Sequence, residues 1–469
     1  MARHLVGITL LLVTLHLAAA PVEAQVSDTV RVDVETAIQR SLDVSPEIEA
    51  VASQVAFAEA RSRLARASRF ATEFSVQTAH AVAPGLMHVP DGVPSDELYL
   101  HPEVRNDWED IRPFNQFETT LLQPLFTWGQ LSGSIDAARH GVDVERAAAE
   151  QKETEVALRT GEIYYGLLLA QQLSRLTEAA GDVVDQARDE IQRLLDEGAE
   201  DVDDADLFQV RITEQEFIRR VVEVDQQLLT VRSALERQLM LPESAVVESE
   251  ELVLEPLPFE IDSLGDYQRL ALAHRPVIEQ ATAGLAAREA QVRVARSEYF
   301  PKLFLGIESR ITLTGGRHRQ PNPYVSDPYR GGSLRTGLGL RLPLNFAQTR
   351  ATVDQAEAQR SEVRHQLEAA RQLVLFEVEE AYRNVITAWA SVNAQNEALT
   401  ISRDWLRTEQ INFDLDLGDT ENLVDAVRSS LELEASYYEQ VRRYNVAVLR
   451  LLAAAGVLDE RARDGTIAE

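Results

Sequence analysis

SPEIEAVASQVAFAEARSRLARASRF, residues 45–70, returns without a gap as RPVIEQATAGLAAREAQVRVARSEYF at residues 275–300. The two stretches lie 230 residues apart and share identities along their whole length: Pro46/Pro276, Ile48/Ile278, Glu49/Glu279, Glu59/Glu289, Ala60/Ala290, Ala65/Ala295, Arg66/Arg296 and Phe70/Phe300. A duplication with so long a period predicts two similar structural units, related by a pseudo-symmetric axis. The period is too long for a solenoid of short repeats.

The first 24 residues have the pattern of a secretory signal. Arg3 supplies a positive charge, residues 5–20 an apolar core, and Val22-Glu23-Ala24 a cleavage site with small residues at both ends. We therefore expect an exported mature chain. Beyond Ala24 no uninterrupted apolar run approaches the roughly 20 residues of a membrane-spanning helix, so a membrane crossing is expected only from strands in a closed barrel.

The composition disfavours several classes of protein. The chain contains no cysteine, so we expect neither disulfides nor a lipid anchor on cysteine. A formal net charge of −30 disfavours binding of nucleic acid over the bulk of the surface. The histidines are too scattered for a zinc site, and no nucleotide-binding loop or catalytic pairing stands out. We predict no cofactor, no metal and no enzymatic activity.

Two stretches, residues 125–241 and 344–469, contain none of the 17 prolines. Because proline breaks helix interiors, both stretches are predicted to hold long helices. A helix over residues 128–197 would extend on the order of 100 Å, several times the thickness of a bilayer. Both stretches place apolar residues every seven positions, which is typical of coiled coils: Ile135, Val142, Ala149, Val156, Ile163 and Ala170, and Val378, Val385, Val392, Leu399, Leu406 and Phe413.

The returning helices show apolar steps of four and three residues, from Phe217 to Leu235 and from Val424 to Leu452. In the second, Asn445 is a polar interruption that is expected to fix the register of the coiled coil. Each long helix turns back at a glycine followed by a capping residue, Gly198 with Asp201 and Gly418 with Thr420. Glycine suits the left-handed position after a helix, and the capping residues start the next helix, so these segments are predicted hairpin tips.

Between the helical stretches the apolar period changes from seven to two. Residues 302–313 and 334–342 alternate apolar side chains with charged or small ones, and residues 70–77 and 116–121 do so more weakly. One apolar and one charged face suit a transmembrane barrel with lipid outside and water inside. Four strands per chain are too few to close a barrel, so we expect oligomerisation.

Together these motifs resemble the outer-membrane efflux proteins of the TolC type over essentially the whole mature chain. The resemblance rests on the order and spacing of several short motifs: Val34-Glu35-Thr36-Ala37-Ile38 before Ser45-Pro46, its echo at residues 270–276, the strand exits at residues 123–126 and 342–346, Glu162-Ile163-Tyr164 and Glu380-Ala381-Tyr382, and the glycine-led tips.

The resemblance implies a homotrimer in which each copy gives four strands to a twelve-stranded outer-membrane β-barrel. The helices would form a coiled-coil α-barrel across the periplasm, and the tips would meet a periplasmic adaptor and, beyond it, an inner-membrane pump of the RND, ABC or MFS type. Such a protein is a passive exit duct in contact with outer-membrane lipid. The sequence does not indicate which cargo is transported or which pump is the partner.

The expected division of the chain follows from these patterns. It comprises a signal peptide (1–24), a first repeat (25–240) with strands at about 70–82 and 115–124 and a helical hairpin at about 127–240, a linker (241–262), a second repeat (263–456) with strands at about 301–313 and 333–343 and a hairpin at about 347–455, and a C-terminal tail (457–469).

Acidic residues crowd both predicted tips, and they have two interpretations. They are either helix caps and solvated surface, or a ring of carboxylates that narrows the tunnel and favours cations. The candidates for the constriction are Asp203, Asp204, Asp416, Asp419 and Asp425, and the candidates for adaptor contact are Gly198, Asp201, Gly418 and Thr420. Asp425 matches a constriction aspartate of the family, whereas Arg428 replaces a second one and can pair with Asp425. Tyr164 and Tyr382 are expected to pack between helices.

Three other interpretations remain open. A periplasmic adaptor would normally carry one helical hairpin, and a purely structural coiled-coil envelope protein would not need the alternating segments. An enzyme in the loop at residues 84–113 would use the acidic residues around Trp108, although polar, acidic loops are common at barrel mouths.

Overall fold

The computed structural model describes residues 28–70, 72–87, 105–197, 204–317, 324, 326–415 and 420–467. The expected signal peptide lies outside these residues. The same order of elements occurs twice along the chain. The first series is α1 (Val34–Val44), α2 (Pro46–Ala67), β2 (Glu73–Leu86), β3 (Asn106–Phe126), α3 (Gln130–Glu197) and α4 (Asp204–Gln238); the second is α5 (Leu264–His274), α6 (Pro276–Ser297), β5 (Lys302–Thr314), β6 (Gly331–Arg341), α7 (Phe346–Asp414) and α8 (Thr420–Ala455).

Corresponding helices have nearly equal lengths. α1 and α5 have 11 residues each, α2 and α6 have 22, α3 and α7 have 68 and 69, and α4 and α8 have 35 and 36. Pro46 and Pro276 begin α2 and α6, where the missing N–H of proline needs no partner. The residues before them, Ser45 and Arg275, are extended, as proline requires of its predecessor. The same turn therefore separates α1 from α2 and α5 from α6.

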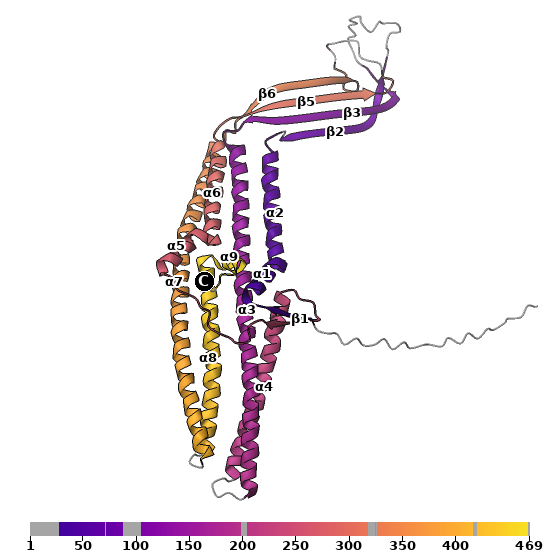
Figure 1. Cartoon of the computed structure of the whole chain (residues 1–469). Helices are drawn as coiled ribbons and strands as arrows, with labels where there is room; N and C mark the ends of the chain where they lie inside the picture. Colours follow the sequence, from indigo (N-terminus) through magenta and orange to yellow (C-terminus); the bar gives the residue numbers. More distant parts are fainter. Residues whose placement is uncertain are drawn as a thin grey trace, which may run out of the picture.

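The long helices form one layer. α3 packs against α2, α4, α6 and α8, and α7 packs against α6 and α8. The order across the layer is α2 with α4, then α3, then α6 with α8, then α7 (Figure 1). Seven of the predicted heptad residues are at most 5% exposed: Val142, Val156, Ala170, Val378, Val385, Val392 and Leu399.

Within the described part of the chain, no helix is both long enough and apolar enough to cross a lipid bilayer.

A four-stranded antiparallel sheet extends from one end of the helical layer, at the end opposite the hairpin turns (Figure 1). Its strand order is β2-β3-β5-β6. β2 and β3 continue into the segment 84–113 that we expected to be a loop, because a bulge between Pro84 and Gly85 lets the ladder resume with Gly85 opposite Asp107.

Two smaller parts of the fold were not predicted. β1 (Asp28–Val32) pairs in parallel with β4 (Ala245–Ser249), so the expected linker 241–262 contributes a strand. The expected tail 457–469 contains α9 (Leu458–Asp464), which packs against α1, α3 and α8. Leu458 and Ala462 of α9 are fully buried.

Asn445 connects α8 to the linker. Its side-chain NH₂ donates to the carbonyl of Glu255 (2.9 Å), and its side-chain oxygen accepts from the N–H of Leu257 (2.9 Å). The residue is 1% exposed. The expectation that Asn445 fixes the coiled-coil register is therefore wrong, because the amide holds the linker against α8 instead.

Replacing Asn445 by alanine should destabilise the protein by about 1–3 kcal/mol, since the carbonyl of Glu255 and the N–H of Leu257 lose their buried partner. Denaturant unfolding followed by circular dichroism measures the loss. Asn396→Ala, at an exposed position of α7, is the matched control and should change stability by less than about 0.5 kcal/mol. Equal losses in the two variants would contradict the role of Asn445.

Candidate functional site

One face of the four-stranded sheet carries charges that pair across strands. Glu118 of β3 accepts from Arg310 of β5 at 3.0 Å, and Glu308 of β5 lies 3.9 Å from Arg335 of β6. The strand register places Gln77 opposite Glu118, so polar side chains continue onto β2. This face is hydrophilic across the width of the sheet, as the alternation in the sequence predicts.

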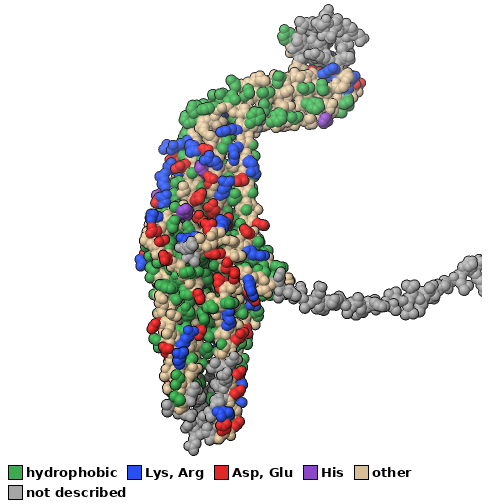
Figure 2. All heavy atoms as spheres, in the orientation of Figure 1, with side chains coloured by type: hydrophobic (Ala, Val, Ile, Leu, Met, Phe, Trp, Pro, Cys, Tyr) green, Lys and Arg blue, Asp and Glu red, His purple; other side chains and the backbone are tan. Residues whose placement is uncertain are grey.

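The other face of the sheet is apolar and exposed. Its large side chains are between 40% and 70% exposed on all four strands: Phe74 and Val76, Phe117, Ile311, and Leu334, Leu338 and Leu340. Figure 2 shows hydrophobic side chains along the sheet, while charged side chains gather on the helical part. An apolar patch of this extent is rare on a water-exposed surface and marks a contact with lipid or with another protein.

The sheet is open at both edges. β2 and β6 each have a single neighbour in the described sheet, so one side of each strand has unpaired backbone N–H and C=O groups. Because β2 leads from α2 and β6 leads into α7, the open edges lie over the two outer flanks of the helical layer.

The same two flanks carry exposed apolar side chains. We call the residues Leu373, Phe376, Ile401 and Ile411 the α7 stripe; they are 52–61% exposed. On the opposite flank, the α4 stripe consists of Phe208, Ile212, Ile218, Val222 and Leu229, which are 49–63% exposed. Each stripe has the residue spacing of a coiled-coil seam, and its side chains are not covered by another helix of the described chain.

At the end of the sheet away from the helices, Arg317 closes a buried cluster that we call the outer clasp. Its guanidinium donates to both carboxylate oxygens of Asp327 (2.9 and 3.1 Å) and to the side chain of Asn106 (2.9 Å). It also donates to the carbonyls of Pro84 (2.5 Å) and Gly85 (2.7 Å). The Arg317 and Asp327 side chains are 0% and 3% exposed.

The outer clasp corrects two expectations. The sequence predicts Arg317, in the basic run Arg317-His318-Arg319 between two strands, to be solvated loop surface. The structure instead buries Arg317, because four groups from both strand pairs converge on its five donors. Asp107, Trp108 and Asp110, considered above as parts of a loop enzyme, lie on β3, and Trp108 packs edge-on against Tyr329. The other acidic residues of that proposal lie outside the described residues.

The hairpin tips are only partly described. Asp425 forms an ion pair with Arg428 on the first turns of α8, the helical pairing that the sequence predicts. Gly198, Asp201, Asp203, Asp416, Gly418 and Asp419 lie outside the described residues, as do the side chains of Asp204 and Thr420. The tip that carries Asp425 is the candidate constriction.

Tyr164 is fully buried, as expected. Its hydroxyl donates to the carbonyl of Val32 (3.3 Å) and to the carboxylate of Glu251, and these bonds connect α3 to β1 and the linker. Burial raises the pKa of the adjacent Tyr165, which keeps its phenol neutral. Tyr382 is partly buried against the core beside Tyr267. Among the described residues, no three His, Asp or Glu side chains are grouped to hold a metal ion.

Residues 268–457 match the family model described as outer membrane efflux protein. The chain is therefore similar, over less than half of its length, to the outer membrane efflux proteins. Two curated proteins are similar to part of it. Protein CyaE of Bordetella pertussis is 30% identical over 217 residues, which cover 45% of this chain and 44% of the relative. The pyoverdine export outer membrane protein OpmQ of Pseudomonas aeruginosa is 28% identical over 188 residues, which cover 40% and 36%.

The matched region thus spans less than half the length of the curated relatives. Solved structures match over most of the chain and share its fold. The outer membrane protein VceC from Vibrio cholerae has a TM-score of 0.71 at 16% identity and covers 90% of this chain and 96% of its own. The CmeC outer membrane channel of Campylobacter jejuni has a TM-score of 0.71 at 14% identity and covers 91% and 86%.

Proposed function

We propose that this chain is an outer-membrane channel, the exit duct of a tripartite efflux or type I secretion system. The observation that carries the proposal is the open four-stranded sheet, apolar on one face and ion-paired on the other, at the end of a helical layer. α3 and α7, with 68 and 69 residues, are each on the order of 100 Å long. Such a protomer suits a pore that crosses the outer membrane and continues into the periplasm.

Three copies of the chain form the channel. Closing a barrel takes about eight strands or more, so the four strands of one protomer do not suffice. β6 of one copy pairs with β2 of the next, which supplies the missing backbone partners at both edges. Repeats 25–240 and 263–456 each contribute two strands and one helical hairpin. Three copies give twelve strands, with the apolar face toward lipid and the charged face toward water.

The helical flanks support the same contact. When β6 meets β2 of the next copy, α7 meets α2 and α4 of that copy, and the α7 stripe covers the α4 stripe. A head-to-tail contact of this kind closes into a ring when its rotation fits a whole number of copies. Sheet edges and helix flanks thus require the same neighbour.

The channel itself is passive. We propose that the tips around Gly198, Asp201, Gly418 and Thr420 contact a periplasmic adaptor protein, and that an inner-membrane pump supplies the energy. The signal peptide exports the chain, the barrel lies in the outer membrane and the helices in the periplasm. We assign no catalytic activity to the channel.

Conductance across a planar lipid bilayer tests the proposal. The purified full chain should insert and produce discrete steps of ion current in the absence of any partner or nucleotide. The passive-duct proposal is overturned if the chain inserts but never conducts, or if current requires ATP.

Asp425 should make the pore selective for cations, because a unit charge at contact distance is worth about 1 kcal/mol in water. Arg428 offsets part of this charge through its ion pair, so Asp425→Ala should lower the cation-to-anion permeability ratio by about twofold. The reversal potential in a salt gradient measures the ratio. Glu432→Ala, farther along α8 from the tip, is the control, and an unchanged reversal potential in Asp425→Ala would sink the constriction hypothesis.

A further inference from the structure

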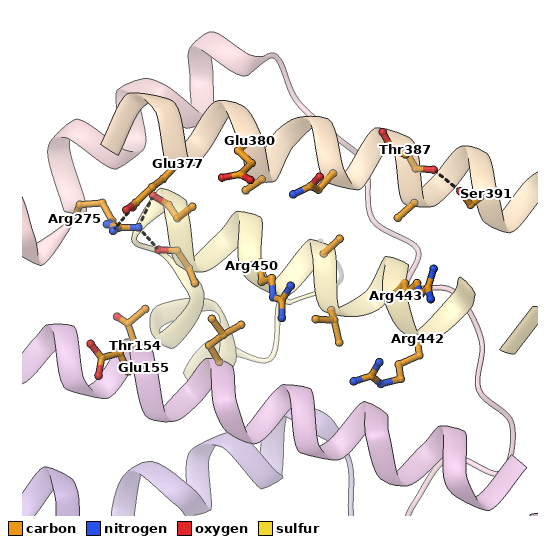
Figure 3. Close-up of a pocket in the computed structure, with 18 of the residues that line it drawn as sticks. Thr154, Glu155, Arg275, Glu377, Glu380, Thr387, Ser391, Arg442, Arg443 and Arg450 are labelled. Carbon is orange, nitrogen blue, oxygen red and sulfur yellow. Dashed lines mark hydrogen bonds and ion pairs between the residues drawn. The ribbon is translucent and has the colours of Figure 1, made fainter. Parts of the chain in front are cut away.

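A cavity of about 730 Å³ lies at the level where α8 ends and α6 begins. α3 and α7 form its two walls and α8 runs between them (Figure 3). Its volume lies in the range of small-molecule sites. We call this cavity the α8 groove.

The floor and the walls of the α8 groove supply apolar surface. Val446, Ala447 and Ala454 of α8 lie along the floor, and Leu158 and Ala388 come from the two walls. Val446, Ala447 and Ala454 are only 6–9% exposed, so an apolar body along α8 would contact them by van der Waals packing. It would exclude water mainly from the partly buried Leu158 and Ala388.

The charged groups of the α8 groove are unequally partnered. Arg275 is held by Glu377 (2.7 Å), and Arg450 by Glu162 (2.7 Å). Glu155 is held by Lys152 (2.6 Å). Three charged side chains remain that have no hydrogen bond or ion pair within the described part of the chain: Arg442 and Arg443 of α8 and Glu380 of α7. A ligand in the groove would therefore meet two guanidiniums and one carboxylate that have no partner within the described part of the chain.

The α8 groove lies on the side of α8 away from the linker. Asn445 binds the linker, and Val448 and Leu452 share its face of the helix, whereas Arg443 and Arg450 lie on the opposite face. Arg442, three residues before Asn445, lies between these two faces and on the side of α8 toward α3 (Figure 3). In a ring with an open centre, the linker and the β1–β4 pair must lie outside. The groove then faces the lumen, and this step rests on the proposed function.

We propose that the α8 groove is a lumenal binding station for amphipathic organic anions, compounds with an apolar body and carboxylate, sulfonate or phosphate groups. The guanidiniums of Arg442 and Arg443 bind the anionic groups, and the floor of α8 takes the apolar body. The station also has an electrostatic effect, because a chain of net charge −30 repels anions from its duct. The two unpaired arginines lower that barrier midway along the helices.

Binding of 1,3,6,8-pyrenetetrasulfonate to the purified full chain in nonionic detergent tests this proposal. The probe combines an aromatic body with four sulfonates, and fluorescence anisotropy reports its binding. Arg442→Gln/Arg443→Gln should weaken binding by about tenfold, since two charge-assisted contacts are lost. Arg442→Lys/Arg443→Lys keeps the charge and should retain most of the affinity. Arg371→Gln/Arg383→Gln removes two arginines of α7 outside the groove and should bind like the wild type.

The outcomes separate this inference from the proposed function. If wild-type channels conduct while Arg442→Gln/Arg443→Gln binds the probe as tightly as wild type, the binding station is wrong and the duct stands. Equal weakening in the Arg371→Gln/Arg383→Gln control also overturns the station, because binding would then follow total charge. Absence of conductance in the wild type removes the duct, and with it the lumenal placement. Circular dichroism checks that the variants are folded.

Discussion

Replacing Phe376 and Ile401 of α7 by aspartate should leave the protomer folded and prevent its assembly. Both residues are 61% exposed in the single chain, so solvent accommodates the new charges there. In the proposed ring the α7 stripe is buried against the next copy, where each unpaired carboxylate would cost several kcal/mol in addition to the lost apolar contact. Native mass spectrometry of the detergent-solubilised protein should show the mass of three chains for the wild type and of one chain for the variant.

Asn396→Asp/Gln410→Asp is the matched control, because it places two charges on exposed positions of α7 outside the stripe. This control should assemble like the wild type. If the stripe variant also assembles like the wild type, α7 is not the helical contact between copies.

Replacing Arg317 by alanine should produce the largest loss of stability from any single side chain of the sheet. It leaves the carboxylate of Asp327 buried without its partner, along with the carbonyls of Pro84 and Gly85. Breaking a buried ion pair in this way costs about 3–5 kcal/mol. Hydrogen exchange at residues 105–112 and 326–331 should therefore accelerate by about a hundredfold or more.

Two further variants make the test of the outer clasp specific. Arg335→Ala removes an ion pair of the same sheet that is 79% exposed on the arginine side, and it should cost less than about 1 kcal/mol. Asp327→Ala added to Arg317→Ala should recover part of the loss, because the stranded charge is then gone. If Arg317→Ala and Arg335→Ala accelerate exchange equally, the clasp does not hold the strand ends together.

The parts of the fold predictable from the sequence are those with a strong period. The heptads of α3 and α7 predicted long packed helices, because apolar residues such as Val156 and Val378 at every seventh position line one side of a helix and pack against a neighbouring helix. The alternation at residues 302–313 predicted a two-faced strand, and its register places Arg310 beside Glu118. Local periodicity contains this information because side-chain direction follows from the helix and strand geometry.

Contacts between distant short segments could not be predicted in the same way. β1 and β4 have five residues each, and their parallel pairing joins positions more than 200 residues apart. Arg317 looks like any arginine in a polar loop, since its partners are distant in sequence: Pro84 and Gly85 of β2, Asn106 of β3 and Asp327. Arg442 and Arg443 are two adjacent arginines in the sequence, with nothing to mark them as part of a site. They line a groove only because α3 and α7 form walls on either side of α8.

The alternatives to a channel explain fewer of these features. An adaptor needs one helical hairpin, whereas α3–α4 and α7–α8 form two of nearly equal length. A structural coiled-coil protein accounts for the heptads but gives no role to the charged face at Glu118 and Arg310. A ring of copies accounts for the helices, the sheet and its open edges together.

Disulfide cross-linking between β6 and β2 tests the shared barrel most directly, because the natural chain has no cysteine. Thr336→Cys is combined in turn with a cysteine at residue 74, 76, 78 or 80, which lie on the same face of the sheet. Within one protomer the two strands lie at opposite edges, so any disulfide joins two copies. The shared barrel predicts that one pairing gives covalent dimers and trimers and nothing larger. Monomers at every pairing, or a ladder that continues beyond three chains, would contradict it.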